Sequence, residues 1–470
     1  MDTRIDPAKV ARFLGAWRSQ TLPDYRALAH GLTSLIDGSL LPAAHVLPSQ
    51  RRLASALGVA RGTVVRAYGI LHESGRLEPR RGSGNYVARP RAVGSDIDGR
   101  LLSFADRSPA VDLSSGALPG DELVAEAIGA VGPMLSGDRL ASPGYSPSGL
   151  PELRSLIAER HTNAGLATSP EQILVTAGAQ QAVWLIANAL AGPGTLTLLE
   201  DPTYRGALEA FAGAGGRVRG VPFDNGHLDL EALRDGVRGA AVLYVQSPIH
   251  NPTGLHYPSR HRRAIGEIAG RCPAIVVDDH SQADLPWFRS SPAPGMEAFA
   301  DPDRLLTIAT LSKLFWGGLR IGWIRGPSPL IRQLGTLKSA ADLGAAVPDQ
   351  LAATLLLPHS RAQLRKRRAV LLARYTEAAA TVREIFPSWT WDQPAGGTGM
   401  WVDTRGDATV LEQRAARAGI RLAPGRLFSR TGRWNRHLRL PVWPKRETMA
   451  EALRAVRSGL EPSVSAHRPS

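Results

Sequence analysis

The stretch LSKLFWGGLRIGW, residues 311–323, follows the apolar run LLTIAT and contains a lysine, two glycines and an arginine. The chain holds 56 lysine and arginine residues, yet Lys313 is the only lysine between positions 10 and 337. A lysine that arginine does not replace is one whose amine acts as a nucleophile, because a guanidinium forms no Schiff base. Arg320 is then placed to bind a phosphate. The alternative is a structural lysine in a loop.

Apolar, β-branched runs recur from about Val111 onward and are separated by amphipathic segments. They include ILVTAG, LTLLED, AVLYVQSP, AIVVDD and LLTIAT. Such runs, when helices separate them, are typical of βαβ units with a mostly parallel, buried sheet. The sequence therefore predicts an α/β fold for the large second part of the 470-residue chain.

Polar residues follow several of these runs. TAGAQQA, residues 176–182, predicts a strand end, a tight turn and a helix start whose backbone N–H groups suit a phosphate. Asn251 is placed to donate to a phenolate oxygen, Asp278 to keep a pyridinium nitrogen protonated, and Tyr204 to stack on a planar cofactor. Each residue alone also fits a helix cap, a tight turn, an ion pair or a core aromatic. Their order along the chain favours a cofactor site.

The first block of the chain has a different pattern and a concentrated positive charge. Residues 1–90 hold 13 lysines and arginines against 6 acidic residues, within a formal net charge of +14 for the whole chain. In LPSQRRLASALGVARGTVVRAY, Ser49 is placed to cap one helix, Gly58 to form a left-handed turn, and a second helix begins near Arg61. LEPRRGSGNYV, residues 77–87, predicts two short strands around a basic turn. The pattern favours a winged helix-turn-helix over a small helical docking module.

The helix-turn-helix interpretation separates core positions from DNA-contacting positions. The residues expected to face inward are Leu53, Ala56, Leu57, Val64, Ala67, Tyr68 and Leu71. The first turn of the second helix can face base edges in a major groove, and nearby arginines can neutralise phosphates. The residues predicted to contact DNA are Ser49, Arg51, Arg52, Arg61, Thr63, Arg66, Arg80 and Arg81.

Composition excludes several classes of protein. No run approaches the roughly 20 apolar residues that span a bilayer, and MDTRIDPAKV lacks the apolar segment of a secretory signal. The single cysteine, Cys272, forms neither an internal disulfide nor a cysteine-based zinc site. We expect a cytoplasmic protein with no metal and no membrane partner. The expected parts are a DNA-binding domain at 1–88, a linker at 89–110, an effector domain at 111–462 and a frayed tail at 463–470.

Both parts of the chain resemble known families. Residues from Tyr25 to Val87 resemble the winged helix-turn-helix domain of the GntR family of bacterial regulators, with Ala60 where that family often has a hydroxyl residue. From about Val111 to Leu460 the chain resembles the fold-type I aminotransferases, which use pyridoxal 5′-phosphate (PLP). Their fusion resembles the MocR/GabR regulators.

The aminotransferase resemblance implies roles for individual residues. Lys313 is the Schiff-base lysine, Asp278 pairs with the pyridine nitrogen, and Asn251 contacts the O3′ oxygen. The residues at phosphate-binding and ring-stacking positions are Gly178, Ala179, Gln180, Tyr204, Thr310, Ser312 and Arg320.

The resemblance also implies residues for the effector and for a second subunit. Arg439, in HLRLPV, matches the arginine that binds a substrate carboxylate, with Arg436 as its nearest competitor. Tyr145 resembles a residue that reaches the neighbouring subunit's cofactor. The family commonly has a tyrosine two or three residues after the cofactor aspartate. His280 and Ser281 stand there, and His280 is counted among the expected cofactor neighbours.

The whole-chain resemblance implies a PLP-dependent regulator that binds a double-stranded DNA operator, forms a homodimer and senses an amine, an amino acid or PLP itself. We expect the chemistry at Lys313 to serve sensing rather than physiological turnover. Two alternatives stay open. One is an active aminotransferase that carries a DNA-binding domain, against which the winged helix argues. The other is a regulator whose large domain only dimerises, against which the retained lysine argues.

Overall fold

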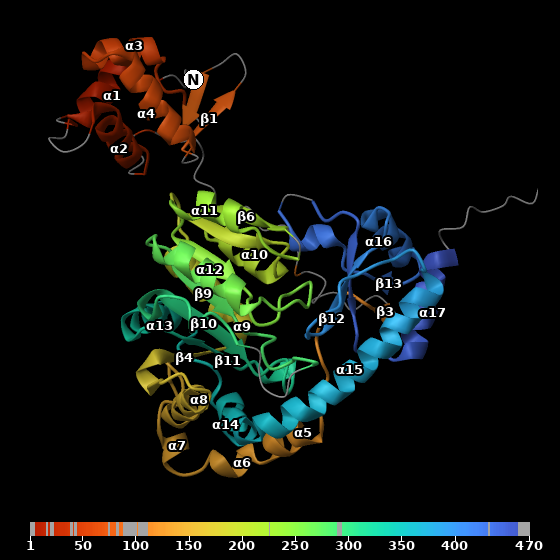
Figure 1. Ribbon diagram of the computed structural model, residues 1–470. Helices are drawn as coiled ribbons and strands as arrows, with labels where there is room; N and C mark the ends of the chain where they lie inside the picture. The colour runs from red at the N-terminus through yellow and green to blue at the C-terminus, as the bar shows by residue number, and fades with distance from the viewer. Residues whose placement is uncertain are drawn as a thin grey trace, which may run out of the picture. The chain divides into compact units, whose positions relative to one another are not determined.

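The computed structural model describes residues 5–15, 17–18, 23–37, 41, 45–73, 76–80, 84–87, 101, 111–224, 226–288, 294–430 and 433–458. Contacts within the chain divide it into two compact units, residues 1–95 and 96–470, and each is described by itself (Figure 1). The predicted linker at 89–110 lies outside the described residues except for Leu101, and the predicted tail at 463–470 lies outside them entirely.

The first unit contains a helix-turn-helix followed by a two-stranded wing. Its elements are α1 (Pro7–Leu14), α2 (Asp24–Asp37), α3 (Gln50–Leu57), α4 (Arg61–Glu73), β1 (Leu77–Arg80) and β2 (Gly84–Val87). The Ser49 hydroxyl caps α3 by accepting a hydrogen bond from the Arg52 backbone N–H at 3.4 Å. Gly58 ends α3 with φ 63° and ψ 39°, a left-handed conformation that costs other residues about 1 kcal/mol or more. The two wing strands pair antiparallel, so the predicted winged arrangement is confirmed.

The core of the first unit lies between its helices. The buried residues include Val10, Leu28, Leu32, Leu53, Val64, Ala67, Tyr68 and Leu71. The Tyr68 hydroxyl donates to the Pro48 carbonyl at 2.9 Å, which satisfies a buried polar group and fixes α4 to the start of α3. The prediction for Ala56 is wrong, because this residue is exposed. Ala54 is buried instead, since the inner face of α3 runs through Leu53, Ala54 and the half-buried Leu57.

An eight-stranded sheet forms the centre of the second unit, in the order β4-β11-β10-β9-β8-β5-β6-β7. Its strands are β4 (Ile173–Thr176), β5 (Leu196–Asp201), β6 (Arg217–Asp224), β7 (His227–Leu228), β8 (Val242–Val245), β9 (Ile275–Asp279), β10 (Leu305–Thr310) and β11 (Gly322–Arg325). The five neighbours from β10 to β6 run parallel, whereas β11, β4 and β7 pair antiparallel. Each apolar run quoted above forms a strand, which confirms the mostly parallel sheet.

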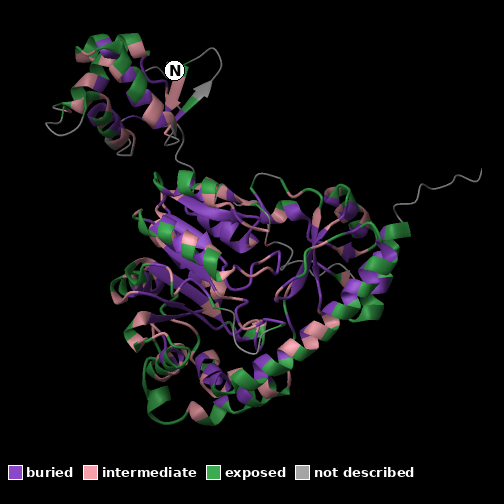
Figure 2. Cartoon of the chain, viewed as in Figure 1, coloured by how far each residue is buried: buried purple, intermediate pink, exposed green. Residues whose placement is uncertain are grey.

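Helices cover both faces of this sheet, and its central strands are buried, whereas β6 toward one edge is only partly so (Figure 2). The covering helices include α8 (Pro151–Asn163), α9 (Ala179–Leu190), α10 (Arg205–Gly213), α11 (Leu230–Val237), α12 (Ser259–Gly270) and α13 (Ser328–Asp342). Tyr244 and Val277 pack with α9, α10 and α13, whereas Val245 and Val276 pack with α11 and α12. This alternation follows from the strand period of two.

A separate layer near the C-terminus packs around two strand pairs. β12 (Gly399–Asp403) pairs antiparallel with β14 (His437–Pro441), and β3 (Val111–Asp112) pairs parallel with β13 (Ile420–Arg421). The remaining helices are α5 (Glu122–Gly129), α6 (Val131–Met134), α7 (Asp138–Ala141), α14 (Val347–Leu356), α15 (Ser360–Ile385), α16 (Ala408–Arg417) and α17 (Arg446–Ser458). Among the described residues, none of the helices combines the length and the apolar character needed to cross a membrane.

Candidate functional site

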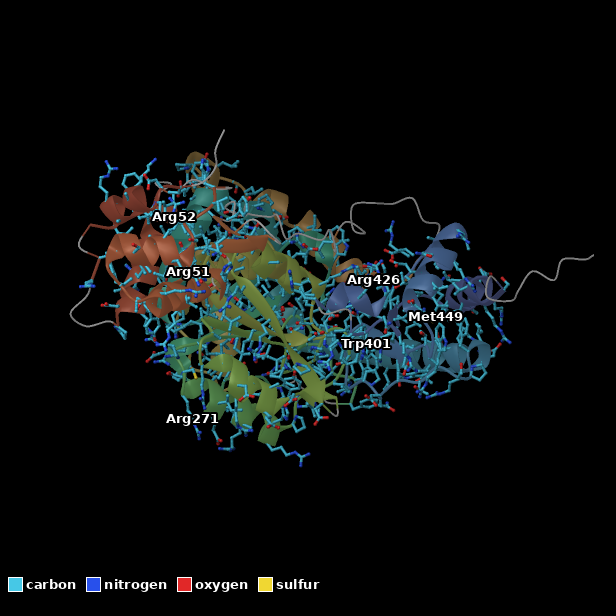
Figure 3. The ribbon with its side chains drawn as sticks, turned by 90° about the horizontal axis from the view of Figure 1, so that it is seen from above. Arg51, Arg52, Arg271, Trp401, Arg426 and Met449 are labelled. Carbon is cyan, nitrogen blue, oxygen red and sulfur yellow. The ribbon has the colours of Figure 1, made fainter. Side chains whose placement is uncertain are left out.

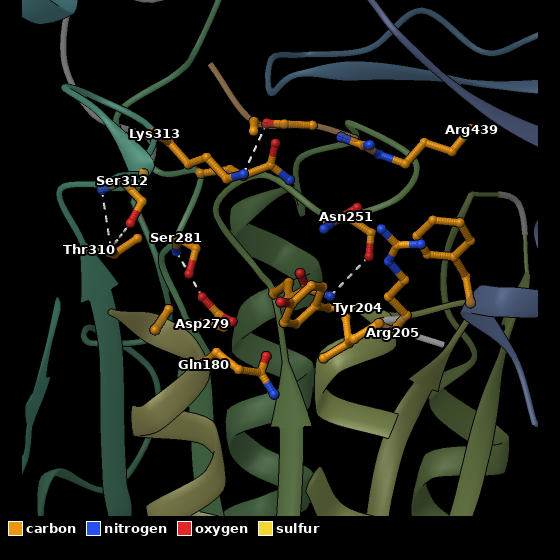
Figure 4. Close-up of a pocket in the computed structure, with 18 of the residues that line it drawn as sticks. Gln180, Tyr204, Arg205, Asn251, Asp279, Ser281, Thr310, Ser312, Lys313 and Arg439 are labelled. Carbon is orange, nitrogen blue, oxygen red and sulfur yellow. Dashed lines mark hydrogen bonds between the residues drawn. The ribbon is translucent and has the colours of Figure 1, made fainter. Parts of the chain in front are cut away.

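A cavity of about 410 Å³ lies where the parallel strands end, between the sheet and the C-terminal layer (Figure 4). Open α/β sheets bind their ligands at this edge. The residues predicted from the sequence that line the cavity are Ala179, Gln180, Tyr204, Asn251, Thr310, Ser312, Lys313, Arg320 and Arg439. The fold therefore brings together residues that lie up to 260 positions apart in the chain.

Lys313 follows β10, and its amine enters the cavity. The Nζ atom donates a hydrogen bond to the Gly116 carbonyl at 2.9 Å. Shielding from solvent, with the nearby guanidinium groups of Arg439 and Arg205, lowers the pKa of Lys313 to about 8. A lysine with such a pKa is about one-tenth neutral at pH 7, against less than about one-thousandth for an ordinary lysine, and the neutral amine is the nucleophile.

One end of the cavity has the character of a phosphate site. Gly178 precedes α9 with φ 81°, and a β-carbon there would lie 2.8 Å from the Arg320 Nη2 atom. Arg320 itself has a left-handed backbone, with φ 49° and ψ 36°, which is uncommon for a non-glycine residue and concentrates at ligand sites. The Thr310 hydroxyl donates to the Ser312 hydroxyl at 2.9 Å. A helix N-terminus, two hydroxyls and a guanidinium together suit a phosphate.

The structure places Asp279 rather than Asp278 at the cavity. Asp279 continues the face of β9 that carries Val277, and this face lies on the cavity side of the sheet. Its Oδ2 atom accepts a hydrogen bond from the Tyr244 hydroxyl at 2.6 Å, and its Oδ1 atom accepts the Ser281 N–H at 2.8 Å. The sequence prediction named Asp278 as the partner of the pyridine nitrogen. The structure favours its neighbour Asp279 for this role.

Asp278 and His280 belong to a buried network away from the cavity. The Asp278 carboxylate accepts hydrogen bonds from the Ser247 N–H and hydroxyl and from the Met296 N–H. His280 Nε2 lies 2.8 Å from Asp278 Oδ2, and its Nδ1 lies 3.5 Å from Glu297 Oε1. Burial alone lowers the pKa of His280, but the carboxylates of Glu297, Asp278 and Asp279 outweigh it and raise the pKa to about 9. His280 does not line the cavity, so its expected place beside a cofactor is corrected.

Arg439 enters the cavity from β14, opposite the strand ends. It is 5% exposed, and its Nη2 atom donates to the Thr398 hydroxyl at 2.7 Å. Burial and the neighbouring Arg205 lower its pKa to about 10, so it stays charged at neutral pH. The competing Arg436 lies at the surface, 3.3 Å from the Asp403 carboxylate. Of the two arginines, only Arg439 is available to a ligand in the cavity.

Sequence reasoning missed several cavity residues. Arg205 begins α10 directly after Tyr204 and is 3% exposed. Ser281 and Gln282 also line the cavity and stand two and three residues after Asp279. Tyr145 is 70% exposed and does not line the cavity of this chain. Its predicted role involves a second chain and remains a prediction.

The first unit presents arginines near the starts of α3 and α4. Arg51, Arg52 and Arg61 are exposed, and Figure 3 labels the first two. Thr63 is half-buried in the first turn of α4. The exposed Arg66 lies one turn further along α4, with its guanidinium 5.6 Å from the ring of Tyr25. This arrangement can place a helix start against base edges and positive charges against phosphates.

A histidine connects α4 to the wing. His72 bonds through Nδ1 to the Leu77 carbonyl at 2.9 Å and through Nε2 to the Asn85 side-chain oxygen at 2.8 Å. The side chain of Arg80 and all of Arg81 lie outside the described residues. Their predicted phosphate contacts remain predictions.

Two family models match the chain. Residues 108–456 match the model "Aminotransferase class I and II", and residues 24–87 match "Bacterial regulatory proteins, gntR family". The chain therefore belongs to the aminotransferase class I and II family and carries a GntR-type helix-turn-helix domain at its N-terminus.

Two curated relatives that match most of this chain are named as HTH-type transcriptional regulators. The HTH-type transcriptional regulator YisV of Bacillus subtilis is 29% identical over 76% of this chain and 79% of its own length. YdcR of Escherichia coli, another HTH-type transcriptional regulator, is 27% identical over 91% of this chain and 97% of its own length. These findings confirm the resemblance to fused GntR–aminotransferase proteins.

Solved structures of aminotransferases share the fold of the large unit. Aspartate aminotransferase from Thermus thermophilus, with maleate, has a TM-score of 0.67 and 25% identity, covering 79% of this chain and 97% of its own. LysN, an α-aminoadipate aminotransferase from the same species complexed with N-(5′-phosphopyridoxyl)-L-leucine, has a TM-score of 0.69 and 26% identity, covering 78% and 96%. The predicted aminotransferase fold is thereby confirmed.

Proposed function

We propose that this protein is a DNA-binding transcriptional regulator that uses PLP in its large unit to sense an amine or an amino acid. One observation carries the proposal: a single chain joins a winged helix-turn-helix to a cavity that holds the shielded amine of Lys313 and the carboxylate of Asp279. The names of YisV and YdcR, which match 76% and 91% of this chain, support a regulatory role.

The cavity residues fit PLP. The side-chain oxygens of Asn251 and Gln180 are buried and accept no hydrogen bond from the described residues, as expected where a polar ligand completes the site. Lys313 would hold the cofactor covalently, Asp279 would face its ring nitrogen, and Arg320 would bind its phosphate. When bound, PLP supplies a carbonyl that condenses with primary amines.

Two arginines favour an effector with a carboxylate. Arg439 and Arg205 both line the cavity from the side opposite the phosphate-like end, and both are nearly inaccessible to solvent. A guanidinium binds a carboxylate through two parallel hydrogen bonds, and the interaction strengthens where water is excluded. We infer that the effector is an amino acid whose amine would condense with the cofactor's carbonyl carbon, releasing the Lys313 amine, and whose carboxylate would bind Arg439.

An active aminotransferase is the second candidate, because the same residues would serve turnover. Retention of Lys313 with Asp279 and Arg439 in one cavity favours it. The helix-turn-helix unit favours sensing, since a purely metabolic enzyme has no use for it. The test is to incubate the protein with an amino acid and a keto acid and to measure the products. Many turnovers per chain would favour the active aminotransferase over the regulator.

The cofactor is tested by absorbance and reductive trapping. Purified full-length protein mixed with PLP should absorb near the visible edge, and borohydride should fix a pyridoxyl group on the peptide that contains Lys313. Lys313→Ala should abolish both results. Lys338→Ala is the matched control, because Lys338 is fully buried but pairs with Asp342 away from the cavity. A reducible adduct that survives in Lys313→Ala would refute the assignment.

DNA binding is tested by a salt series with operator and random duplexes. Arg61→Ala should relax base discrimination, at a cost of about 1–3 kcal/mol, because it removes a contact at the start of α4. Arg52→Ala should weaken both duplexes alike and lower the salt slope by about one. Arg271→Ala is the control, since Arg271 is exposed on the large unit. Unchanged affinity in both first-unit variants would exclude this unit as the DNA-binding surface.

We further propose a homodimer. The large unit exposes large apolar side chains at Ile128, Leu140, Tyr145, Trp184 and Leu343. A second chain could cover these side chains, as happens at protein–protein interfaces. Light scattering should give twice the monomer mass, and a monomer at micromolar concentration would contradict the proposal.

A further inference from the structure

Tyr244 is a buried tyrosine whose hydroxyl is directed at the cavity carboxylate. It lies in the middle of β8, is fully buried, and packs its ring against Phe211 at 5.9 Å between centroids. Its hydroxyl donates to Asp279 Oδ2 at 2.6 Å, while the Ser281 N–H donates to the other oxygen at 2.8 Å. Each oxygen of this carboxylate therefore has a fixed donor from the protein.

The hydroxyl of Tyr244 favours the charged form of Asp279, whose pKa burial raises above its usual value. Burial raises the pKa of Asp279, whereas the hydrogen bonds from Ser281 and Tyr244 oppose that rise. Burial and the adjacent Asp279 hold the pKa of Tyr244 well above 10, so this hydroxyl remains a donor throughout the physiological range. The other titratable groups that act on Asp279 are His280, next in the chain, and Tyr204 and Lys313 across the cavity.

We propose that Tyr244 is a positioning residue that holds the Asp279 carboxylate ionised and aimed into the cavity, and that it thereby controls the protonation of the cofactor's ring nitrogen. The proposal rests on the proposed function, in which Lys313 holds PLP. An ionised Asp279 favours the protonated ring, which withdraws electrons more strongly. Tyr244 does not itself line the cavity, so it acts only through Asp279.

The chain offers a matched control. Tyr257 is also fully buried and also donates a short hydrogen bond to a carboxylate, at 2.5 Å from Glu200 Oε1. Neither Tyr257 nor Glu200 lines the cavity. Phenylalanine at either position keeps the ring and removes only the hydroxyl. The two variants therefore separate an effect on Asp279 from the general effect of losing a buried hydrogen bond.

The experiment uses full-length protein loaded with PLP. Bound-cofactor absorbance is recorded from pH 5 to pH 10, and PLP affinity is measured by equilibrium dialysis. Tyr244→Phe should shift the midpoint of the absorbance titration by about one pH unit and weaken PLP binding about tenfold, the size of one lost charge-assisted hydrogen bond. Tyr257→Phe should leave both quantities unchanged.

Two further variants exclude a merely structural role. In a double-mutant cycle, Tyr244→Phe should add nothing to Asp279→Asn, because both remove the same interaction. Tyr244→Met should shift the titration in the same direction as Tyr244→Phe, which guards against a folding defect in either variant.

The outcomes distinguish this proposal from the function on which it rests. A Tyr244→Phe titration equal to wild type, in protein that binds PLP, overturns the role of Tyr244 and leaves the proposed function intact. An equal shift in Tyr257→Phe also overturns it, because the effect would then not pass through Asp279. Wild-type protein that binds no PLP overturns both.

Discussion

Replacing Lys313 with methionine should stabilise the cofactor-free protein. Lys313 lies in a cavity with Arg205 and Arg439, and shielding from solvent together with these charges lowers its pKa from 10.5 to about 8. The protonated amine is therefore less stable in the folded chain than in the unfolded one, by about 3 kcal/mol at most. Water in the cavity screens part of this penalty, and methionine loses the bond to Gly116, worth about 1 kcal/mol. We expect a net gain of about 1–2 kcal/mol at pH 7.

The pH dependence of this gain has a definite sign. Below about pH 8 the amine is protonated in both folded and unfolded chains, so the penalty on the wild type is complete. Between pH 8 and pH 10.5 the folded chain binds fewer protons than the unfolded one, and wild-type stability rises with pH. The advantage of Lys313→Met should therefore be full at pH 7 and should shrink toward pH 10.5.

The assay is urea unfolding of PLP-free protein at pH 7 and pH 10, followed by a probe of the large unit. Lys338→Met is the control, because Lys338 is fully buried but pairs with Asp342 at 2.6 Å. Its loss should destabilise the protein, since Asp342 would lose its cationic partner and keep only the hydrogen bonds from Gln181 and Gly344. A Lys313→Met variant that is less stable than wild type at pH 7, or whose advantage does not change with pH, would contradict this prediction.

Three further predictions concern single positions. Arg439→Ala should abolish the preference for an amino acid over its decarboxylated amine, whereas Arg436→Ala should not; equal responses of the intact protein to both compounds would contradict a carboxylate site. Gly58→Ala should cost the first unit about 1 kcal/mol, because φ there is 63°; an unchanged unfolding midpoint would argue against a left-handed turn. Asp279→Asn should weaken PLP binding, whereas Asp278→Asn should mainly lower the unfolding midpoint. The reverse pattern would restore Asp278 as the cofactor aspartate.

The sequence predicted the elements well, because their physical causes are local. The apolar runs became strands since each is buried, and Gly58 was found because a left-handed turn favours glycine. Lys313 could be identified because lysine is rare in this chain. Arg205 could not, since arginine is the common cation here and no neighbouring pattern separates a cavity arginine from a surface one.

The sequence pattern alone does not distinguish Asp278 from Asp279 as the cavity carboxylate. Two consecutive carboxylates at a strand end point to opposite faces, so a shift of one residue changes the face completely. Which face meets the cavity depends on which helices cover it, and Val277 gives that information only once α9 and α10 are packed against it. The role of Tyr145 cannot be tested within a single chain, because the residue is predicted to reach the cofactor of a second chain.

The hydrogen bond between Lys313 and Gly116 has a consequence for signal transmission. Gly116 stands four residues after β3, which anchors the start of the large unit to β13. Four residues span at most about 14 Å, so the anchored chain segment and the reactive amine are mechanically close. If Lys313 held a cofactor through its amine, that nitrogen would keep at most one proton, and its bond to the Gly116 carbonyl would be weakened or lost. We therefore expect occupancy of the cavity to change the backbone contact at Gly116, four residues after β3.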